Sequence, residues 1–321
     1  MLKVTIDNRL IEVEEGTTIL QAARMIGGDV VPPAMCYHSK VKNTGGKCRT
    51  CLVKVVKGSE KDPRPMPKLV PSCRTMVMDG MEVQNSTSPE VIQARKGIVE
   101  FLLINHPLDC PVCDQAGECD LQNLSYQNGK SETRFEEEKR EFEVHDIGEK
   151  IQLHTNRCIL CYRCVYLADQ LTDKRVHGVL YRGDTAEIST LIHQSIDNEF
   201  SGNIIDVCPV GALTDKSFRF KNRVWFLKPM DAHRDCPTCS GKVALWFRGN
   251  EVYRVTSRKD QFGESESFIC NTCRYDKKEA TDWVIEGPRE VKQLSVINQN
   301  HYKVVVKPAV ISPIEGKMEI K

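Results

Sequence analysis

Apolar and polar residues alternate from the start of the chain. Residues 2–7 and 10–13 alternate on either side of a polar turn, which predicts a β-hairpin. Apolar and β-branched residues are also frequent over 51–56 and 81–83, where two further strands are predicted.

A short helix is predicted between the hairpin and the third strand. Thr18 followed by Gln21 is a capping-box pattern, and Gly27 with Gly28 marks the helix end. Hairpin, helix and strands together predict a small α+β domain over residues 1–84.

A second helix is predicted to begin at Ser88, which can cap it with Pro89 in its first position. The apolar residues at helical spacing are Val91, Ala94, Ile98, Phe101 and Leu102. These residues are expected to form the buried face, and the helix is expected to end just before His106.

The rest of the chain shows weaker patterns. Residues 128–145 are charged and poor in apolar residues, which favours a surface connection. Strands are predicted over 243–247 and 251–256, and the tail alternates over 303–310. The longest apolar runs fall far short of the roughly 18 residues that span a membrane, so no direct membrane insertion is expected.

Composition narrows the function classes. The chain has 321 residues, a net charge of +1 and 15 cysteines. A near-neutral chain without a basic stripe is not expected to bind nucleic acid. No phosphate-binding glycine motif and no catalytic constellation is found, so no catalytic residue and no nucleotide site is predicted.

The cysteines fall into four groups of ligand spacing, with one histidine making up the fourth ligand of the second group. The groups are Cys36, Cys48, Cys51 and Cys73; His106, Cys110, Cys113 and Cys119; Cys158, Cys161, Cys164 and Cys208; and Cys236, Cys239, Cys270 and Cys273. No cysteine is left over, which predicts a scaffold for several metal centres. Several redox centres in one chain indicate electron transfer.

The third group has the most specific spacing. Cys158, Cys161 and Cys164 form a C-x2-C-x2-C run, and Cys208 is followed directly by Pro209. This resembles the bacterial ferredoxin pattern for [4Fe-4S]. A zinc site is the alternative, but zinc sites use CxxC pairs rather than a triplet.

The first group centres on Cys48 and Cys51, with one cysteine on either side. Four thiolates on a loop of a β-rich domain are consistent with a [2Fe-2S] cluster. The gap of eleven residues between Cys36 and Cys48 departs from the plant-type ferredoxin spacing. Zinc and buried unliganded thiols are the alternatives.

The second group has only three cysteines, and a cubane cluster needs a fourth ligand. His106 lies four residues before Cys110 and is a competent iron ligand. The alternative is a structural histidine near a helix end.

The fourth group consists of two CxxC pairs, Cys236 with Cys239 and Cys270 with Cys273. Two such pairs around a predicted hairpin are also the pattern of a zinc ribbon. Spacing alone leaves [4Fe-4S] and zinc open here.

Four segments carry a resemblance to a known family. They are CYHSKVKNTGGKCRTCLVKV, HPLDCPVCDQAGECDLQ, RCILCYRCV and IIDVCPVGALTDKSFRFKNRVW. They resemble the large iron–sulfur subunit of respiratory NADH:quinone oxidoreductase (complex I). The resemblance covers residues 1 to about 285.

The resemblance implies an α+β, multi-module fold. It implies a ferredoxin-like β-grasp domain holding [2Fe-2S] on the first group, one [4Fe-4S] on the second and another on the third. The expected modules are 1–84 for the first cluster, 85–127 for the second, 128–221 for the third, 222–285 for the small β-rich tetracysteine subdomain and 286–321 for the tail.

Two departures from the family pattern concern the C-terminal part. Family members normally continue into a large molybdopterin-oxidoreductase-like domain, so a short form or a fragment is expected. Some members hold an extra [4Fe-4S] cluster with a C-x2-C-x3-C pattern, whose third position here is Val243. Cys273 stands beside Cys270 instead, so the fourth metal is left as [4Fe-4S] or zinc.

The implied function is electron transfer within complex I, an oxidoreductase, from the flavin-bearing NADH-oxidising subunit toward the quinone-proximal iron–sulfur subunits. The implied location is the cytoplasmic side of the bacterial inner membrane, as a peripheral subunit. The alternatives are the iron–sulfur module of an NAD-linked hydrogenase or formate dehydrogenase, and a zinc-stabilised scaffold without a redox role.

Overall fold

The computed structural model describes residues 1–142, 144–173, 176–190, 196 and 198–289, and the backbone of 310–311 and 318–319. Two compact units divide the chain, Met1–Glu290 and Val291–Lys321. Two short strands, β15 (Val310–Ile311) and β16 (Met318–Glu319), pair in the second unit. The alternating tail predicted over 303–310 lies almost entirely outside the described residues.

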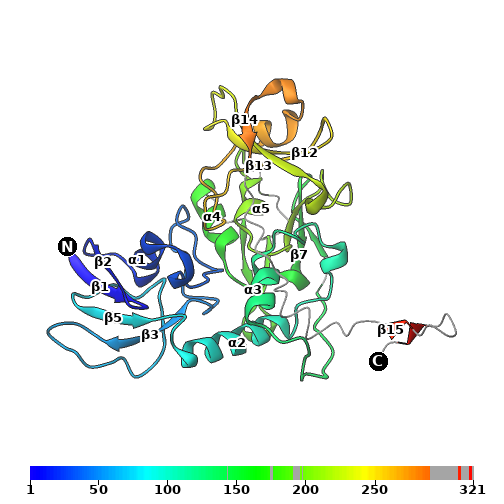
Figure 1. Ribbon diagram of the computed structural model, residues 1–321. Helices are drawn as coiled ribbons and strands as arrows, with labels where there is room; N and C mark the ends of the chain where they lie inside the picture. The colour runs from blue at the N-terminus through cyan, green and yellow to red at the C-terminus, as the bar shows by residue number, and fades with distance from the viewer. Residues whose placement is uncertain are drawn as a thin grey trace. The chain divides into compact units, whose positions relative to one another are not determined.

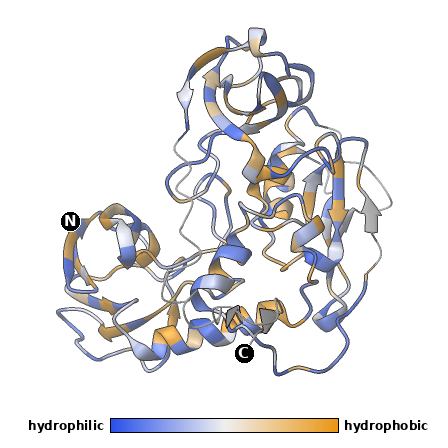
Figure 2. Cartoon of the chain, turned by 45° about the vertical axis from the view of Figure 1, so that its right-hand side comes forward, coloured by the Kyte–Doolittle hydropathy of each residue, from blue (hydrophilic) through white to orange (hydrophobic). Residues whose placement is uncertain are grey.

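A mixed five-stranded sheet begins the first unit (Figure 1). Its strands stand in the order β2-β1-β5-β3-β4, with β1 parallel to β5 and antiparallel to β2. The strands are β1 (Leu2–Ile6), β2 (Arg9–Val13), β3 (Leu52–Lys57), β4 (Val70–Pro71) and β5 (Met81–Gln84). The predicted hairpin and both later strands are therefore confirmed. Hydrophobic positions recur along the strands beside the N-terminus (Figure 2).

Helix α1 (Ile19–Ile26) packs its apolar face on this sheet. The Thr18 hydroxyl accepts a hydrogen bond from the Gln21 N–H at 3.3 Å, and the Gln21 side chain accepts one from the Thr18 N–H at 2.9 Å. The predicted capping box is thus confirmed, and Gly27, with φ of 79°, ends the helix.

Helix α2 (Pro89–Leu103) begins at Ser88 and ends before His106, as predicted. Its predicted buried face is wrong in part. The buried residues are Val91, Arg95 and Val99, whereas Phe101 is 75% exposed. Arg95 is buried because it donates hydrogen bonds to the Thr50 carbonyl oxygen and the Asn85 side chain, so its polar groups are satisfied away from water.

Short elements form the middle of the unit. A three-stranded sheet has the order β10-β7-β6, and β8 pairs with β9. The largest hydrophobic core packs here, and it includes cysteines of the first, second and third groups. These elements are α3 (Asp120–Asn128), β6 (Val144–Asp146), β7 (Ile151–His154), α4 (Arg163–Leu171), β8 (His177–Leu180), β9 (Glu187–Thr190), α5 (Asn203–Val207) and β10 (Leu213–Asp215).

A four-stranded antiparallel sheet follows, in the order β13-β12-β11-β14. Its strands are β11 (Lys228–His233), β12 (Lys242–Arg248), β13 (Glu251–Ser257) and β14 (Val284–Pro288). The predicted strands over 243–247 and 251–256 correspond to β12 and β13 and are confirmed. The prediction of mixed α and β structure is confirmed as well.

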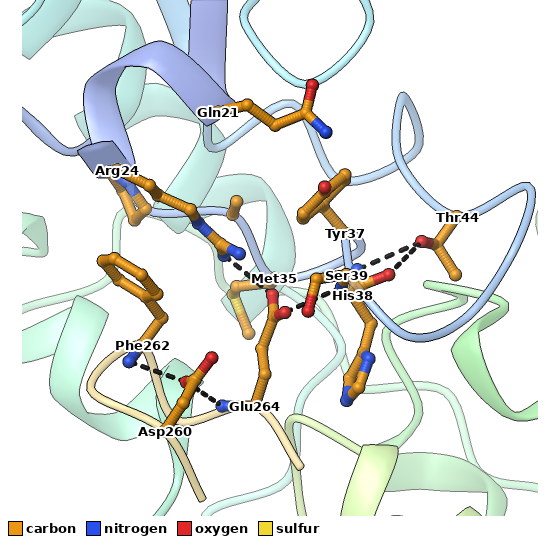
Figure 3. Close-up of polar contacts among 12 residues, drawn as sticks. Gln21, Arg24, Met35, Tyr37, His38, Ser39, Thr44, Asp260, Phe262 and Glu264 are labelled. Carbon is orange, nitrogen blue, oxygen red and sulfur yellow. Dashed lines mark hydrogen bonds and ion pairs between the residues drawn. The ribbon is translucent and has the colours of Figure 1, made fainter. Parts of the chain in front are cut away.

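A buried ion pair joins α1 to the loop after β13 (Figure 3). The guanidinium of Arg24 contacts a carboxylate oxygen of Glu264 at 2.7 Å and lies over the rings of Tyr37 and Phe262. The other oxygen of Glu264 accepts a hydrogen bond from the Ser39 N–H at 2.7 Å. Burial opposes ionisation of Glu264, but Arg24 and Ser39 outweigh it and hold the pKa of that carboxyl below its usual range.

Helices that could cross a membrane were sought among the described residues. None there combines the length and the apolar character that a membrane span requires.

Candidate iron–sulfur and metal centres

The first cysteine group lies on loops around the N-terminal sheet, and all four thiols are buried. The Sγ atoms of Cys51 and Cys73 are 3.4 Å apart. Backbone N–H groups of Lys47 and Cys48 donate to the Cys36 Sγ at 3.2 and 3.3 Å. Such N–H donors stabilise the negative charge of sulfur in iron–sulfur sites, so the site has the chemistry that a cluster needs.

Two backbone features hold this loop. Arg49 lies between Cys48 and Cys51 with φ of 64°, and Gly45 has φ of 102°. A Cβ atom on Gly45 would stand 3.2 Å from the Cys73 Sγ, so the glycine lets the backbone approach the sulfur closely. Hydrogen bonds with Cys48 and then Cys73 hold the pKa of the Cys36 thiol well below its usual range.

The third group lines one cavity in the main core. Cys158, Cys161, Cys164 and Cys208 surround it together with apolar side chains such as Leu153. Burial raises the pKa of Cys161 to about 12. Four thiolates in such a place are costly unless a metal group compensates their charge, so the donor set fits a metal cluster.

Local backbone geometry places these cysteines. Leu160 and Tyr162, which lie between the cysteines of the run, have φ of 51° and 65° in the left-handed region. This curls the run back on itself before α4 begins at Arg163. Cys208 comes from elsewhere, at the C-terminal end of α5.

The second group follows α2. His106 lies three residues past the end of the helix, Cys110 starts a short 3-10 turn, and Cys119 directly precedes α3. Cys113 and Cys119 are buried, whereas Cys110 is exposed. Burial, followed by the charges of Arg157 and Lys139, lowers the pKa of His106 to about 4, so its ring is neutral at pH 7.

The ring of His106 has an open coordination position. Its Nδ1 atom is buried and has no hydrogen-bond partner among the residues that the structure describes. A buried polar atom without a partner is costly, and a metal ion would satisfy it. The residue therefore fits the ligand role predicted from the shortage of cysteines.

One short segment joins the second and third groups. The Pro209 carbonyl oxygen accepts a hydrogen bond from the Asp120 N–H at 3.1 Å, and the Cys119 Sγ lies 3.8 Å from the same oxygen. A Cβ atom on Gly211 would overlap the Cys113 Sγ. The backbone that follows Cys208 therefore lies directly against two cysteines of the second group.

Arg163 joins the first and third groups. Its guanidinium donates to the carbonyl oxygens of Ala34 and Tyr37, at 2.9 and 2.5 Å, and to that of Val207 at 3.4 Å. Ala34 and Tyr37 flank Cys36, and Val207 precedes Cys208. A single buried side chain thus links the backbones of two ligand loops.

The fourth group is the most compact. The Sγ atoms of Cys236, Cys239, Cys270 and Cys273 all lie within 4.8 Å of one another. Cys236 and Cys239 precede β12, and the other two stand in the loop after β13. Val243, the third position of the family pattern, is a fully buried residue of β12 in the surrounding core.

Three supporting residues were not found from the sequence: Arg163, Gly211 and Arg274. Arg163 gave one signal, because it stands inside the C-x2-C-x2-C run. Gly211 and Arg274 gave none that spacing or periodicity could isolate, since their contacts are to distant parts of the chain.

Comparison with known proteins covers much of the described chain. Residues 1–88 match the family described as 2Fe-2S iron-sulfur cluster binding domain. Residues 95–134 match the NADH-ubiquinone oxidoreductase-G iron-sulfur binding region, and residues 148–214 match the ferredoxin-like domain of NADH-quinone oxidoreductase subunit 3.

Curated relatives carry consistent names. The chain is 41% identical over 261 residues to the G-type subunit of the NADH-quinone oxidoreductase of Rickettsia bellii, which covers 81% of this chain and 37% of the relative. It is 41% identical over 275 residues to the NADH-ubiquinone oxidoreductase 75 kDa subunit of Reclinomonas americana, covering 86% and 38%. The chain thus spans a little over a third of the length of these relatives.

A solved structure is also similar. A chain in the crystal structure of an NAD+-reducing [NiFe]-hydrogenase in the H2-reduced state aligns with a TM-score of 0.59 and 27% identity, over 70% of this chain and 91% of that one. Three family matches and the curated relatives agree on one assignment. The chain belongs to the family of large iron–sulfur subunits of NADH-quinone oxidoreductase, known as the G-type or 75 kDa subunits.

Proposed function

We propose that this chain is an electron-transfer subunit of an NADH:quinone oxidoreductase, complex I. Its partners would be the flavin-bearing NADH-oxidising subunit and the quinone-proximal iron–sulfur subunits. The names of its relatives and its three iron–sulfur family matches support this assignment. Its place would be peripheral, on the cytoplasmic side of a bacterial inner membrane.

We assign the ligands group by group, in modules over 1–84, 85–127 and 128–221. Cys36, Cys48, Cys51 and Cys73 would hold [2Fe-2S]. His106, Cys110, Cys113 and Cys119 would hold one [4Fe-4S], and Cys158, Cys161, Cys164 and Cys208 the other. Bound clusters supply one-electron redox chemistry at these positions. The buried thiols, the N–H donors to sulfur and the unpartnered His106 Nδ1 support the assignment.

The observation that carries the proposal is the contact between ligand loops. Arg163 bonds to the backbone beside Cys36 and to the backbone beside Cys208. Pro209 and Gly211 bring the third group against the second. The chain's own residues therefore set a spatial order of first, third and second group, which suits transfer along the chain rather than three separate functions.

Reductive titration of the anaerobically purified chain tests this function. We expect about 10 irons per chain at the first three groups, from one [2Fe-2S] and two [4Fe-4S], and electron paramagnetic resonance signals of reduced clusters. With the flavin-bearing subunit added, NADH is expected to produce the same signals. Intact, freshly prepared protein with little or no iron would contradict the proposal and favour a zinc scaffold.

The likeness to the hydrogenase structure supports a second candidate, an iron–sulfur module of an NAD-linked hydrogenase. The higher identity to the NADH-quinone oxidoreductase relatives favours complex I. Co-purification from the native cell separates the two. Recovery with a nickel-containing subunit, and reduction by hydrogen, would support the hydrogenase.

Replacing His106 by cysteine is expected to keep a cluster but to lower its reduction potential, by an amount on the order of 100 mV. The physical reason is that a thiolate adds a negative charge to the ligand set, whereas the imidazole is neutral. A redox titration followed by electron paramagnetic resonance measures the shift.

The matched control for this prediction is His177→Cys, because His177 on β8 is also fully buried but belongs to none of the four groups. This control is expected to leave the potential unchanged. An unchanged potential in His106→Cys would remove His106 from the ligand set.

A further inference from the structure

We propose that the fourth group, Cys236, Cys239, Cys270 and Cys273, holds a single zinc ion and not a [4Fe-4S] cluster. The site then takes no part in electron transfer and serves as a structural centre. The inference is independent of the proposed function, since it concerns a group that the ordered contacts among the other three do not include.

The separation of the sulfur atoms supports one ion. The Sγ atoms of Cys236 and Cys270 are 3.8 Å apart, and those of Cys239 and Cys273 are 3.7 Å apart. Four thiolates at about 2.3 Å from a tetrahedral zinc ion stand about 3.8 Å from one another. Two edges of the observed set therefore have the length that a zinc tetrathiolate requires.

The same separation does not fit a cubane. In [4Fe-4S] each thiolate binds a different iron, so the sulfurs stand roughly 4 Å from the centre and roughly 6 Å or more from one another. All four Sγ atoms here lie within 4.8 Å of each other. Among the residues that the structure describes, the fourth group has this compactness, and the groups assigned to cubanes do not show it.

Backbone geometry around the first pair also suits one small ion. The N–H groups of Thr238 and Cys239 donate to the Cys236 sulfur, and the Gly241 N–H donates to the Cys239 Sγ at 3.4 Å. These bonds form a tight turn in which a Cβ atom on Gly241 would overlap the Arg234 carbonyl oxygen. Gly241 has φ of 64°, so both conformation and space require a glycine.

The second pair repeats the arrangement from the other loop. The Cys273 N–H donates to the Cys270 Sγ at 3.4 Å, and both side chains are fully buried. N–H donors offset part of the net negative charge that four thiolates leave around a divalent ion.

The burial of this pair indicates a structural role. Cys270 and Cys273 belong to a small core with Val243, Leu245 and Trp283, which includes residues of β11, β12 and β13. A core of this size gives limited stability by itself, and a closed tetrathiolate zinc site commonly supplies the rest. The zinc ion would thus hold two loops and a sheet together.

Metal analysis of the full chain tests the proposal. Protein purified anaerobically from cells supplied with both metals is expected to contain about one zinc per chain in addition to the iron of the other groups. X-ray absorption at the zinc edge is expected to show four sulfur neighbours at about 2.3 Å. Protein produced with cobalt in place of zinc is expected to show the visible bands of tetrahedral cobalt tetrathiolate, which needs no variant to fold.

Two variants separate this site from the iron sites. Cys236→Ser is expected to lose the zinc and to keep the iron, because Cys236 is partly exposed and belongs to the fourth group alone. Cys164→Ser is expected to lose iron and to keep the zinc. These opposite outcomes also distinguish a failure of the zinc proposal from a failure of the electron-transfer proposal.

Three results would overturn the inference. One is about four additional irons with matching sulfide and no zinc, which indicates a cubane. Another is one additional iron without sulfide or zinc, which indicates a mononuclear iron site. The third is zinc that remains at one per chain in Cys236→Ser, which places the zinc elsewhere.

Discussion

Gly211→Ala is expected to remove the cluster of the second group. The new methyl group would overlap the Cys113 Sγ and would stand 3.1 Å from the Gln115 Cβ. A thiolate fixed by a metal cannot move aside, so either the ligand or the backbone after Cys208 has to shift. Iron is expected to fall by about four atoms per chain, from about 10 at the first three groups.

Iron analysis and electron paramagnetic resonance measure this loss, and Gly97→Ala is the matched control. Gly97 lies in α2, and a Cβ atom there meets nothing within 4 Å. Alanine is favoured over glycine inside a helix by about 1 kcal/mol, so the control is expected to keep its iron and its stability. Full iron in Gly211→Ala would show that the Cys113 sulfur is not held where the structure places it.

Asp206→Asn is expected to lower the free energy of unfolding by about 3–5 kcal/mol. Asp206 on α5 forms a bidentate pair with Arg274, and the two side chains are 4% and 2% exposed. Burial opposes ionisation of Asp206, but Arg274 outweighs it and holds the pKa of that carboxyl below its usual range. Removing the negative charge leaves a buried guanidinium without its counter-ion.

Denaturant unfolding of the loaded protein measures this change, and Asp62→Asn is the control. Asp62 pairs with Arg64 at 2.7 Å, but the two side chains are 54% and 85% exposed. Exposed pairs contribute about 0–1 kcal/mol, so the control is expected to change little. Equal effects of the two substitutions would mean that Arg274 finds another partner or water when Asp206 is neutral.

The ion pair also explains how distant parts of the chain are joined. Asp206 lies two residues before Cys208, and Arg274 directly follows Cys273. Asn203, on the same short helix, donates to the Ile269 carbonyl oxygen at 2.8 Å and accepts from the Ile269 N–H at 3.0 Å. Helix α5 is therefore tied on one side to the third group and on the other to the loop of the fourth.

The sequence was most informative where local chemistry decides the structure. Alternation predicted the N-terminal hairpin, and Thr18 with Gln21 predicted the start of α1, because both patterns act within a few residues. Cysteine spacing divided the thiols into four groups for the same reason. The module boundaries and the iron ligands themselves stay predictions.

Tertiary contacts decided what the sequence did not show. The buried face of α2 differs from the predicted one because Arg95 finds acceptors on Thr50 and Asn85, which no helical periodicity reveals. The contacts of Gly211 with Cys113 depend on the approach of two loops that are far apart in the chain. The separation of the four sulfurs in the last group is likewise a property of two loops in space, and spacing along the chain left its metal open.

The segment from Cys208 to Gly211 has a consequence for biogenesis. Cys113, Cys119 and Cys208 are each only 8% exposed, and this segment lies against the first two of them. An assembly factor that delivers iron and sulfide therefore has no open route to these thiols once the loops have closed. Cofactor insertion has to precede the final packing step, so maturation and folding of this chain form one ordered process.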